Sequence, residues 1–326
     1  MAGTGTDILV VSVPGTTGWR GAAHELCASL RRAGASAAVA VSAEVPRVRT
    51  FALTDFVEAR AARRACEQGV AEHDPAAVIY CSITAALLWP RPGAIWIDSL
   101  AAENRPGRHG IWQRTVERRR LRQAPLVLAM SPQALDPAAA GTRAIELVPV
   151  PVRRSGPLPA SRDIAAVTYA GNPEKKRLEF VLGAWERARR GEETLVVAGT
   201  EPLAPRPGVE FAGRLDAHEY RTLLRRAQTF VAAPTREDYG IAPLEALADG
   251  CKLVSTPAPG PYPALELARK LDPRLVSDDL AAAIRVGLDD PAPNYAERAA
   301  QLLAPFSHEA VDRTVAERVL PRLLSA

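Results

Sequence analysis

Short apolar runs alternate along the chain with longer segments in which apolar residues recur every three or four positions. A short apolar or β-branched run is typical of a buried strand, and the longer spacing is typical of an amphipathic helix. Two such helical segments are AAHELCASLRRAG (22–34) and IWQRTVERRRLRQ (111–123). The alternation predicts βαβ units, and therefore parallel sheets with helices on both faces.

The same pattern predicts eleven strands in two groups. Six lie in the first half of the chain, at 7–13, 37–41, 77–81, 94–97, 126–130 and 145–148. Five lie in the second half, at 165–170, 194–198, 210–212, 229–232 and 252–256.

A proline-rich segment, LVPVPVRRSGPLPASRD (147–163), separates the two groups. Proline cannot donate to a sheet ladder or continue a helix, so this segment is predicted to be a linker. We therefore expect domains at 1–155 and 156–305, and a C-terminal helix at 306–326. The predicted fold is α/β, with two Rossmann-like, doubly wound domains that face a central cleft.

The composition fits a globular protein of two ordinary domains. The chain has 326 residues, of which 47% are apolar and 24% charged, enough for two cores. The N-terminus has no signal-peptide pattern, and no apolar run approaches the roughly 18 residues of a membrane span. Four widely spaced cysteines fit free thiols in a reducing compartment. We expect a cytoplasmic protein.

The positive charge is concentrated in the first half of the chain. The net charge is +4, and the first 155 residues carry 19 arginines and no lysine against 13 acidic residues. This excess suits an anionic membrane surface or an anionic acceptor, and an arginine-rich solvated surface explains it equally well. Peripheral contact with the inner membrane face therefore stays open, and we expect no nucleic-acid partner.

The first strand is followed by a glycine-rich segment, PGTTGWRG (14–21), with the spacing G-x-x-G-x-x-G. Glu44, after the second strand, fits the acidic residue of a dinucleotide site. A short-chain reductase also needs a Tyr-x-x-x-Lys pair, which none of the four lysines forms. No G-K-[ST] follows the glycines, so a Walker A loop is excluded as well.

The segment PTREDYGIAPLEALADGCKLVSTPAPG (234–260) carries the strongest chemical signal. It contains two glutamates eight residues apart, Glu237 and Glu245. Gly240 predicts a tight turn, and IAPLEALADG (241–250) predicts a helix that Gly250 terminates. Backbone amides at the start of such a helix form a site for a diphosphate.

This E-x7-E pattern resembles the retaining family 4 glycosyltransferases of the GT-B fold. The resemblance implies that Glu245 binds the nucleotide ribose and that Glu237 lies beside the donor sugar. It also implies that the residues between them, Tyr239, Gly240, Ile241 and Ala242, hold the diphosphate.

A second match is VTYAGNPEKKRLEFVLGAW (167–185), which resembles the basic segment that clamps the diphosphate in this family. Gly171 ends the predicted strand, and Lys175 and Lys176 follow it. We expect Lys176 to make the phosphate contact. The family usually has an arginine where Asn172 stands and a glycine where Arg177 stands.

Other positions follow from the same resemblance. Gly213 is expected beside the base of the nucleotide. In the first domain, Gly18 belongs to a glycine-rich loop that faces the donor. Asp98, at the end of a strand, and His109, on a later loop, are the two candidates for a catalytic residue near the acceptor.

The resemblance therefore implies a glycosyltransferase that acts with retention, needs no metal and uses a nucleotide-diphosphate sugar as donor substrate, with no cofactor. The acceptor stays open among a saccharide, a lipid-linked sugar and a small molecule. Other functions also remain open: a catalytically silent GT-B protein that binds a nucleotide sugar or acts as a scaffold, a GT-B sugar-nucleotide epimerase, or a phosphorylase-like enzyme.

Overall fold

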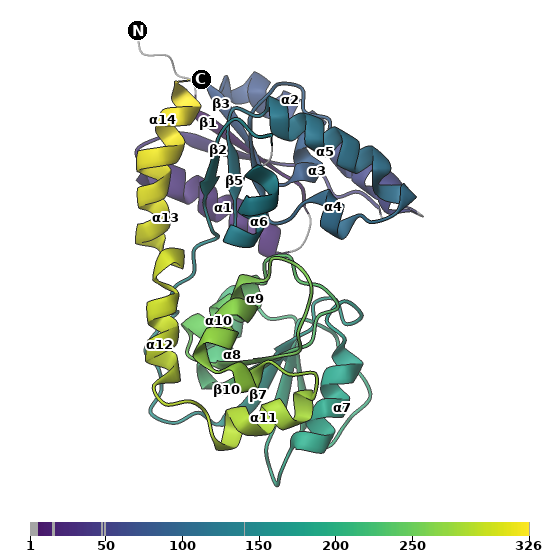
Figure 1. Ribbon diagram of the computed structural model, residues 1–326, viewed down its shortest axis with the longest axis vertical. Helices are drawn as coiled ribbons and strands as arrows, with labels where there is room; N and C mark the ends of the chain where they lie inside the picture. The colour runs from purple at the N-terminus through teal and green to yellow at the C-terminus, as the bar shows by residue number, and fades with distance from the viewer. Residues whose placement is uncertain (1–5, 15–16, 47, 49, 140, 326) are drawn as a thin grey trace. The chain divides into compact units, whose positions relative to one another are not determined.

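The structure is a computed structural model that describes residues 6–14, 17–46, 48, 50–139 and 141–325 (Figure 1). The chain forms two compact units. The first comprises residues 1–151 and 308–326, and the second comprises residues 152–307. Within the described ranges, no helix has both the length and the apolar composition needed to cross a membrane.

The first unit contains a six-stranded parallel sheet in the order β2-β1-β3-β4-β5-β6. In register, Ile8 of β1 lies opposite Ala37 of β2 on one side and Ala77 of β3 on the other. The strands are β1 (Ile8–Ser12), β2 (Ala37–Val41), β3 (Ala77–Tyr80), β4 (Ala94–Ile97), β5 (Val127–Ala129) and β6 (Ile145–Leu147). The helices before the linker are α1 (Thr17–Arg32), α2 (Phe51–His73), α3 (Ile83–Ala86), α4 (Ala101–Asn104), η1 (Arg108–Gly110), α5 (Ile111–Gln123) and α6 (Pro132–Ala139).

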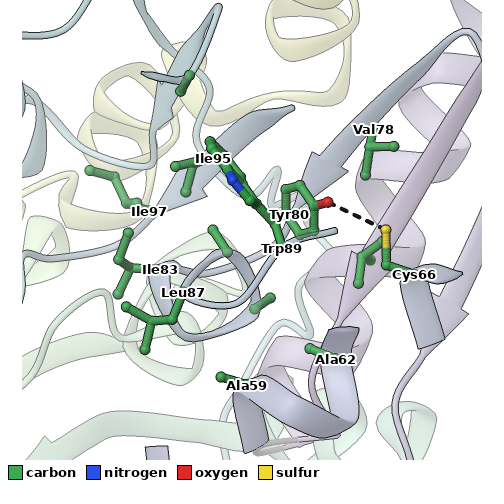
Figure 2. Packing of buried hydrophobic residues seen from close by; sticks show 14 of the residues in the cluster. Ala59, Ala62, Cys66, Val78, Tyr80, Ile83, Leu87, Trp89, Ile95 and Ile97 are labelled. Atoms are coloured by element: carbon green, nitrogen blue, oxygen red, sulfur yellow. Dashed lines mark hydrogen bonds between the residues drawn. The ribbon is translucent and has the colours of Figure 1, made fainter. Parts of the chain in front are cut away.

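A hydrophobic cluster in the first unit joins the sheet to α2 and α3 (Figure 2). Tyr80 and Trp89 pack at its centre, with ring centroids 5.5 Å apart. The Tyr80 hydroxyl is paired: it donates to the carbonyl of Arg91 at 2.9 Å and lies 3.3 Å from Cys66 Sγ. Because a buried hydroxyl without a partner costs free energy, these contacts let a tyrosine occupy the core.

The C-terminal helices α13 (His308–Thr314), η4 (Val315–Val319) and α14 (Leu320–Leu324) belong to the first unit. Asp312 accepts from Ser29 at 2.5 Å and from Arg32 at 2.6 Å, which joins α13 to α1. Several of their apolar side chains are buried, namely those of Val311, Val315, Val319, Leu320 and Leu323.

The second unit contains a five-stranded parallel sheet in the order β11-β10-β7-β8-β9. Its strands are β7 (Ile164–Tyr169), β8 (Leu195–Ala198), β9 (Val209–Gly213), β10 (Ala227–Ala232) and β11 (Lys252–Ser255). Its helices are α7 (Leu178–Ala188), α8 (Ala217–Arg226), α9 (Ile241–Ala248), α10 (Pro263–Leu271), η2 (Pro273–Leu275), α11 (Leu280–Asp289), α12 (Tyr295–Leu302) and η3 (Ala304–Phe306).

All eleven predicted strands are confirmed, each end to within two residues. The doubly wound fold class is confirmed as well. In the second unit, the chain leaves β7 toward β8 on one side and later returns to β10 on the other. Ligands of open α/β sheets bind at such a reversal, beyond the carboxyl ends of the strands. The fold therefore directs attention to the loops that follow β7 and β10.

The predicted linker has no helix or strand in the described residues 148–163, but part of it is held firmly on the second unit. The Ser155 amide donates to Asp249 at 2.8 Å, and Arg162 donates to the Asp249 carbonyl at 2.8 Å. The division between units at 151/152 therefore lies a few residues before the boundary expected from the prolines.

We predict that the C-terminal helices are needed for the stability of the first unit. Val315 is fully buried, so Val315→Asp places an unpaired carboxylate in the core and should lower the free energy of unfolding by about 3 kcal/mol or more. Leu324→Asp is the matched control, since Leu324 is 48% exposed and should tolerate the same change. Urea unfolding monitored by circular dichroism measures both, and equal losses of stability would contradict the burial of Val315 in the core.

Candidate functional site

The loops after β7 and β10 meet at the point where the strand order reverses. The amide of Thr235, after β10, donates to the carbonyl of Lys175, after β7, at 3.0 Å. Asn172 shapes the first loop, because its side chain accepts from the Lys175 amide at 2.9 Å and its carbonyl accepts from the Lys176 amide at 3.0 Å. These contacts hold the two loops together although they are some 60 residues apart in sequence.

Lys176 and Glu237 form an ion pair between these loops. Their side chains are 23% and 11% exposed, so both charges are largely withdrawn from solvent. Thr168, Phe230 and Tyr262 line the small pocket around the pair. An isolated charge is costly at such depth, and each residue supplies the counter-charge that the other needs.

Helix α9 begins beside this ion pair. Gly240 is its N-cap residue and has a φ of 78°, a left-handed conformation that glycine adopts readily. A Cβ at this position would lie 2.8 Å from the Tyr262 ring and 3.1 Å from Glu237 Cγ, so no larger residue fits. Gly240 has no side chain to cap the helix, and the first-turn amides of Ile241 and Ala242 have no intrahelical acceptor.

The other end of α9 closes as the sequence predicts. Gly250 has a φ of 80°, and its amide donates to the Leu247 carbonyl at 3.0 Å. The Cys251 amide donates to the Ala246 carbonyl at 2.8 Å, which completes a Schellman motif. The helix is therefore short and rigidly terminated, and Glu245 lies in its second turn.

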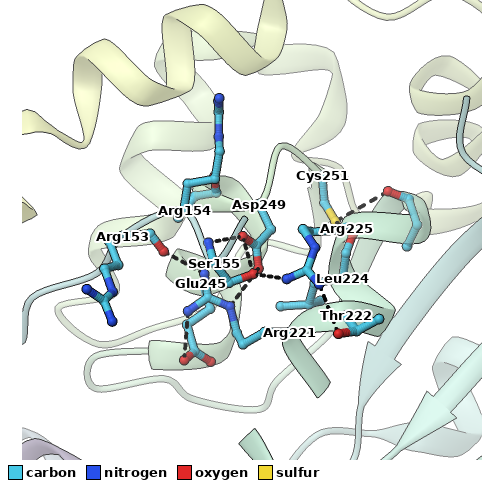
Figure 3. Close-up of polar contacts among 12 residues, drawn as sticks. Arg153, Arg154, Ser155, Arg221, Thr222, Leu224, Arg225, Glu245, Asp249 and Cys251 are labelled. Atoms are coloured by element: carbon cyan, nitrogen blue, oxygen red, sulfur yellow. Dashed lines mark hydrogen bonds and ion pairs between the residues drawn. The ribbon is translucent and has the colours of Figure 1, made fainter. Parts of the chain in front are cut away.

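Glu245 faces a guanidinium from α8 (Figure 3). Arg221 Nη1 lies 3.5 Å from Glu245 Oε1, and the Glu245 side chain is 25% exposed. Burial raises the pKa of Glu245 to about 7. The positive charge of Arg221 lowers this pKa, and the negative charge of Asp249 raises it further. The carboxylate is thus poised to ionise near neutral pH.

Residues 163–290 match the family model described as "Glycosyl transferases group 1". The matched residues contain β7 to β11 and both glutamates of the site. Most of the second unit is therefore similar to a group 1 glycosyltransferase domain. No protein of curated function has a sequence that matches this chain.

Several solved structures with a similar fold are sugar-transferring or sugar-phosphate-synthesising enzymes by their titles. Sucrose-phosphate synthase from Thermosynechococcus elongatus has a TM-score of 0.67 at 16% identity, over 98% of this chain and 100% of that one. WaaG, a glycosyltransferase involved in lipopolysaccharide biosynthesis, has a TM-score of 0.69 at 13% identity, over 95% and 98%. The α,α-trehalose-phosphate synthase (UDP-forming) from Burkholderia xenovorans has a TM-score of 0.68 at 12% identity, over 97% and 100%. The chain therefore has the GT-B fold.

The remaining predicted residues of the group 1 domain lie at the carboxyl ends of strands. Gly171 is exposed just after β7, and a Cβ there would lie 2.7 Å from the Tyr169 hydroxyl. Gly213 ends β9 with a φ of 68°, and its carbonyl accepts from Gly199 at 2.7 Å. Lys175 is exposed, and Tyr239 is buried beside Gly240.

Three predicted residues belong to the first unit and not to the group 1 domain. Gly18 lies in the first turn of α1, where the sequence suggested a loop, since the helix already begins at Thr17. Asp98 directly follows β4 and accepts from Ser99 Oγ at 3.4 Å. The backbone of His109 lies in η1, and its side chain is outside the described part of the structure.

The sequence did not single out Arg221, Asp249, Tyr262 or Gly260, all of which shape the site. Arg221 and Asp249 carry no motif of their own, because their importance comes from the packing of α8 against α9. Tyr262 and Gly260 belong to the segment PAPGPYP (257–263), whose proline content marks a fixed loop at the carboxyl end of β11. That signal could have placed them at the site.

Gly260 allows the loop after β11 to approach Glu237. Its φ is 108°, and a Cβ would lie 2.2 Å from the Glu237 carbonyl oxygen. We predict that Gly260→Ala lowers the free energy of unfolding by about 2 kcal/mol or more and loosens the loop at 235–240. Gly191→Ala is the control, because Gly191 also has a positive φ, 52°, but no atom within 4 Å of an added Cβ.

Urea unfolding and amide hydrogen exchange measure these two effects. Faster exchange at 235–240 is expected in Gly260→Ala alone. If Gly191→Ala showed the same stability loss and the same exchange, the close approach of the two loops would not matter.

Proposed function

We propose that this chain is a retaining glycosyltransferase that moves a sugar from a nucleoside-diphosphate sugar to an acceptor hydroxyl. One observation carries the proposal: the Lys176–Glu237 ion pair lies beside the amino end of α9 at the strand reversal of a group 1 domain. A cation, a carboxylate and helix amides without an intrahelical acceptor in one partly buried place suit a donor that bears two phosphates and a sugar.

The proposed roles follow the chemistry of each group. The amides of Ile241 and Ala242 and the ammonium of Lys176 bind the diphosphate, with Lys175 nearby in solvent. Glu245 accepts from the ribose hydroxyls, and Gly213 lies beside the base. Glu237 accepts from hydroxyls of the donor sugar.

In the proposed reaction, the acceptor oxygen bonds to the anomeric carbon on the face from which the diphosphate leaves. The bond from that carbon to the phosphate oxygen breaks, and the acceptor proton passes to an oxygen of the departing diphosphate. Negative charge grows on the diphosphate in the transition state, and Lys176 and the helix amides stabilise it there. These groups supply the stabilisation without calling on a metal ion.

The first unit is proposed to bind the acceptor. Asp98 and His109 remain the candidates near the acceptor hydroxyl. A saccharide, a lipid-linked sugar and a small molecule all fit this scheme as acceptors. The four cysteines are buried free thiols, which suits the reducing cytoplasm where we propose that the protein acts.

We predict that Glu237→Gln and Lys176→Ala each lower kcat/KM for sugar transfer by about 100-fold or more. Each removes a charge that the donor would meet, while Glu237→Gln keeps the side-chain shape. Lys270→Ala is the control, because it removes an exposed lysine of the same unit, and it should transfer sugar normally. Near-normal turnover of Glu237→Gln and Lys176→Ala would contradict the site.

A screen of UDP-, GDP-, ADP- and TDP-sugars by thermal shift identifies the donor, since a ligand that binds only the folded state raises Tm. Binding of a donor without transfer to any acceptor would favour a silent binding protein. Conversion of the free nucleotide sugar without an acceptor would favour an epimerase.

We also propose that the first unit contacts an anionic membrane. Leu53 and Phe56 on α2 and Ile111 on α5 are 51%, 38% and 55% exposed. Phe56 packs against Trp112 with ring centroids 5.9 Å apart, so the amino-terminal parts of α2 and α5 lie together. Exposed arginines continue the same helix faces, namely Arg60, Arg63 and Arg64 on α2 and Arg118, Arg119 and Arg122 on α5.

The charge of α5 is nearly all positive toward solvent. Its one acidic residue, Glu117, is 3% exposed and accepts from the Ala101 amide at 2.8 Å. Burial raises the pKa of Glu117 to about 7, which weakens its negative charge at neutral pH. Exposed apolar side chains near the amino ends of α2 and α5, with exposed arginines further along both helices, suit insertion into the headgroup layer of an anionic bilayer.

We predict that the protein sediments with phosphatidylglycerol-containing vesicles and not with pure phosphatidylcholine vesicles. The combined change Leu53→Ser, Phe56→Ser and Ile111→Ser should abolish most of this binding. Leu203→Ser is the control, because Leu203 is 41% exposed in the second unit. Unchanged vesicle binding of the triple variant, or binding to heparin but not to vesicles, would contradict a membrane surface.

A further inference from the structure

Arg221 contacts three different partners around α9 (Figure 3). Its Nε donates to Asp249 Oδ2 at 2.6 Å, and its Nη2 donates to the carbonyl of Arg153 at 2.6 Å. Its Nη1 lies 3.5 Å from Glu245 Oε1. All three nitrogens of the guanidinium are therefore engaged, and the Arg221 side chain is only 14% exposed.

Asp249 provides the fixed point of this network. It is fully buried and accepts from the Ser155 amide at 2.8 Å and from the Ser155 hydroxyl at 2.9 Å. A buried carboxylate with this many donors is held in one position, since any rotation would break a charge-assisted hydrogen bond. Arg221 is tied to that position and to the backbone of the segment that enters the second unit.

Glu245 has less support than Asp249. The charged or titratable groups that face it are Arg221 and Tyr220 from α8 and Asp249, the C-cap residue of α9. Only Arg221 favours the ionised carboxylate. Burial and Asp249 both raise the pKa of Glu245, whereas the ionised carboxylate is the stronger acceptor for ribose hydroxyls.

We propose that Arg221 is a positioning residue of the donor site, which fixes the Glu245 carboxylate as the acceptor for the ribose hydroxyls by anchoring it to Asp249 and to the Arg153 carbonyl. This proposal rests on the donor role given above to Glu245. Arg221 itself does not contact the donor. If Arg221 were purely structural and only linked α8 to Asp249, its replacement would leave the pH midpoint of donor binding unchanged.

Arg221→Gln tests the two alternatives. With the cation removed, the pKa of Glu245 should rise, and donor binding at pH 7 should weaken by about tenfold. The affinity should recover at higher pH, so the midpoint of the pH dependence moves upward. The donor KM should rise more than kcat falls, whereas simple loss of folded protein would lower kcat alone.

Arg225→Gln is the matched control on the same helix. Arg225 donates to Ser155 Oγ and, at 2.9 Å, to Thr222 Oγ1, and it lies in the same network without a contact to Glu245. Its removal should leave the pH midpoint of donor binding where it is. Arg221→Lys keeps a cation at the site, so its pH midpoint of donor binding should lie closer to that of the wild type than the midpoint of Arg221→Gln does.

In Asp249→Asn, we expect the pKa of Glu245 to shift in the opposite direction. It keeps a group that can accept from Ser155 but removes the negative charge that competes with Glu245 for Arg221. The pKa of Glu245 should fall, and the pH midpoint of donor binding should move downward. Opposite shifts in two variants that both disturb the same network cannot come from a general loss of stability.

The titration of Glu245 in the unliganded protein separates this proposal from the donor proposal. Carbon-13 NMR of labelled glutamate, assigned with Glu245→Gln, follows the carboxyl directly. An upward shift in Arg221→Gln with donor binding in the wild type supports the proposal. An unchanged Glu245 titration in Arg221→Gln overturns it, whether or not a donor binds. If the wild type binds no nucleotide sugar, the donor role fails and the positioning role with it, even where the titration shifts.

Discussion

Burial of carboxylates around one short helix is the constraint on which the second unit depends. Glu237, Glu245 and Asp249 lie before, within and just after α9, and all are largely withdrawn from water. Each acidic group in such a place needs a cation or several donors. Lys176 and Arg221 supply the cations, and because they come from other elements, the loop after β7 and helix α8 are held against α9.

Tight turns allow the chain to pack closely around these buried carboxylates. Gly240 and Gly260 both have positive φ values and both bring backbone close to Glu237. Arg177 adopts the same left-handed region, with a φ of 50°, where the family resemblance suggested a glycine. A non-glycine residue there costs about 1 kcal/mol, and the stacking of its guanidinium on Phe180, 4.1 Å from the ring centroid, offsets part of that cost.

Local patterns therefore predicted the elements well and the contacts poorly. Strand positions follow from apolar runs, and the ends of α9 follow from Gly240 and Gly250, because each depends on a few neighbouring residues. The Lys176–Glu237 pair joins positions 61 residues apart, and no sequence pattern specifies which lysine meets which glutamate. Asp249 belongs to no sequence motif, and tertiary packing buries it completely.

The Lys176–Glu237 ion pair would also rearrange when a donor binds. Without a donor, Lys176 and Glu237 neutralise each other, so neither is an unpaired charge in a partly buried pocket. A diphosphate brings more negative charge than one carboxylate, and it would draw the Lys176 ammonium toward itself. Glu237 would then lose its partner at the moment when sugar hydroxyls become available as donors. The proposed substrate thus offers a new partner to both residues, the diphosphate to Lys176 and the sugar hydroxyls to Glu237. Binding of a complete nucleotide sugar is therefore favoured over binding of a free nucleotide or a free sugar.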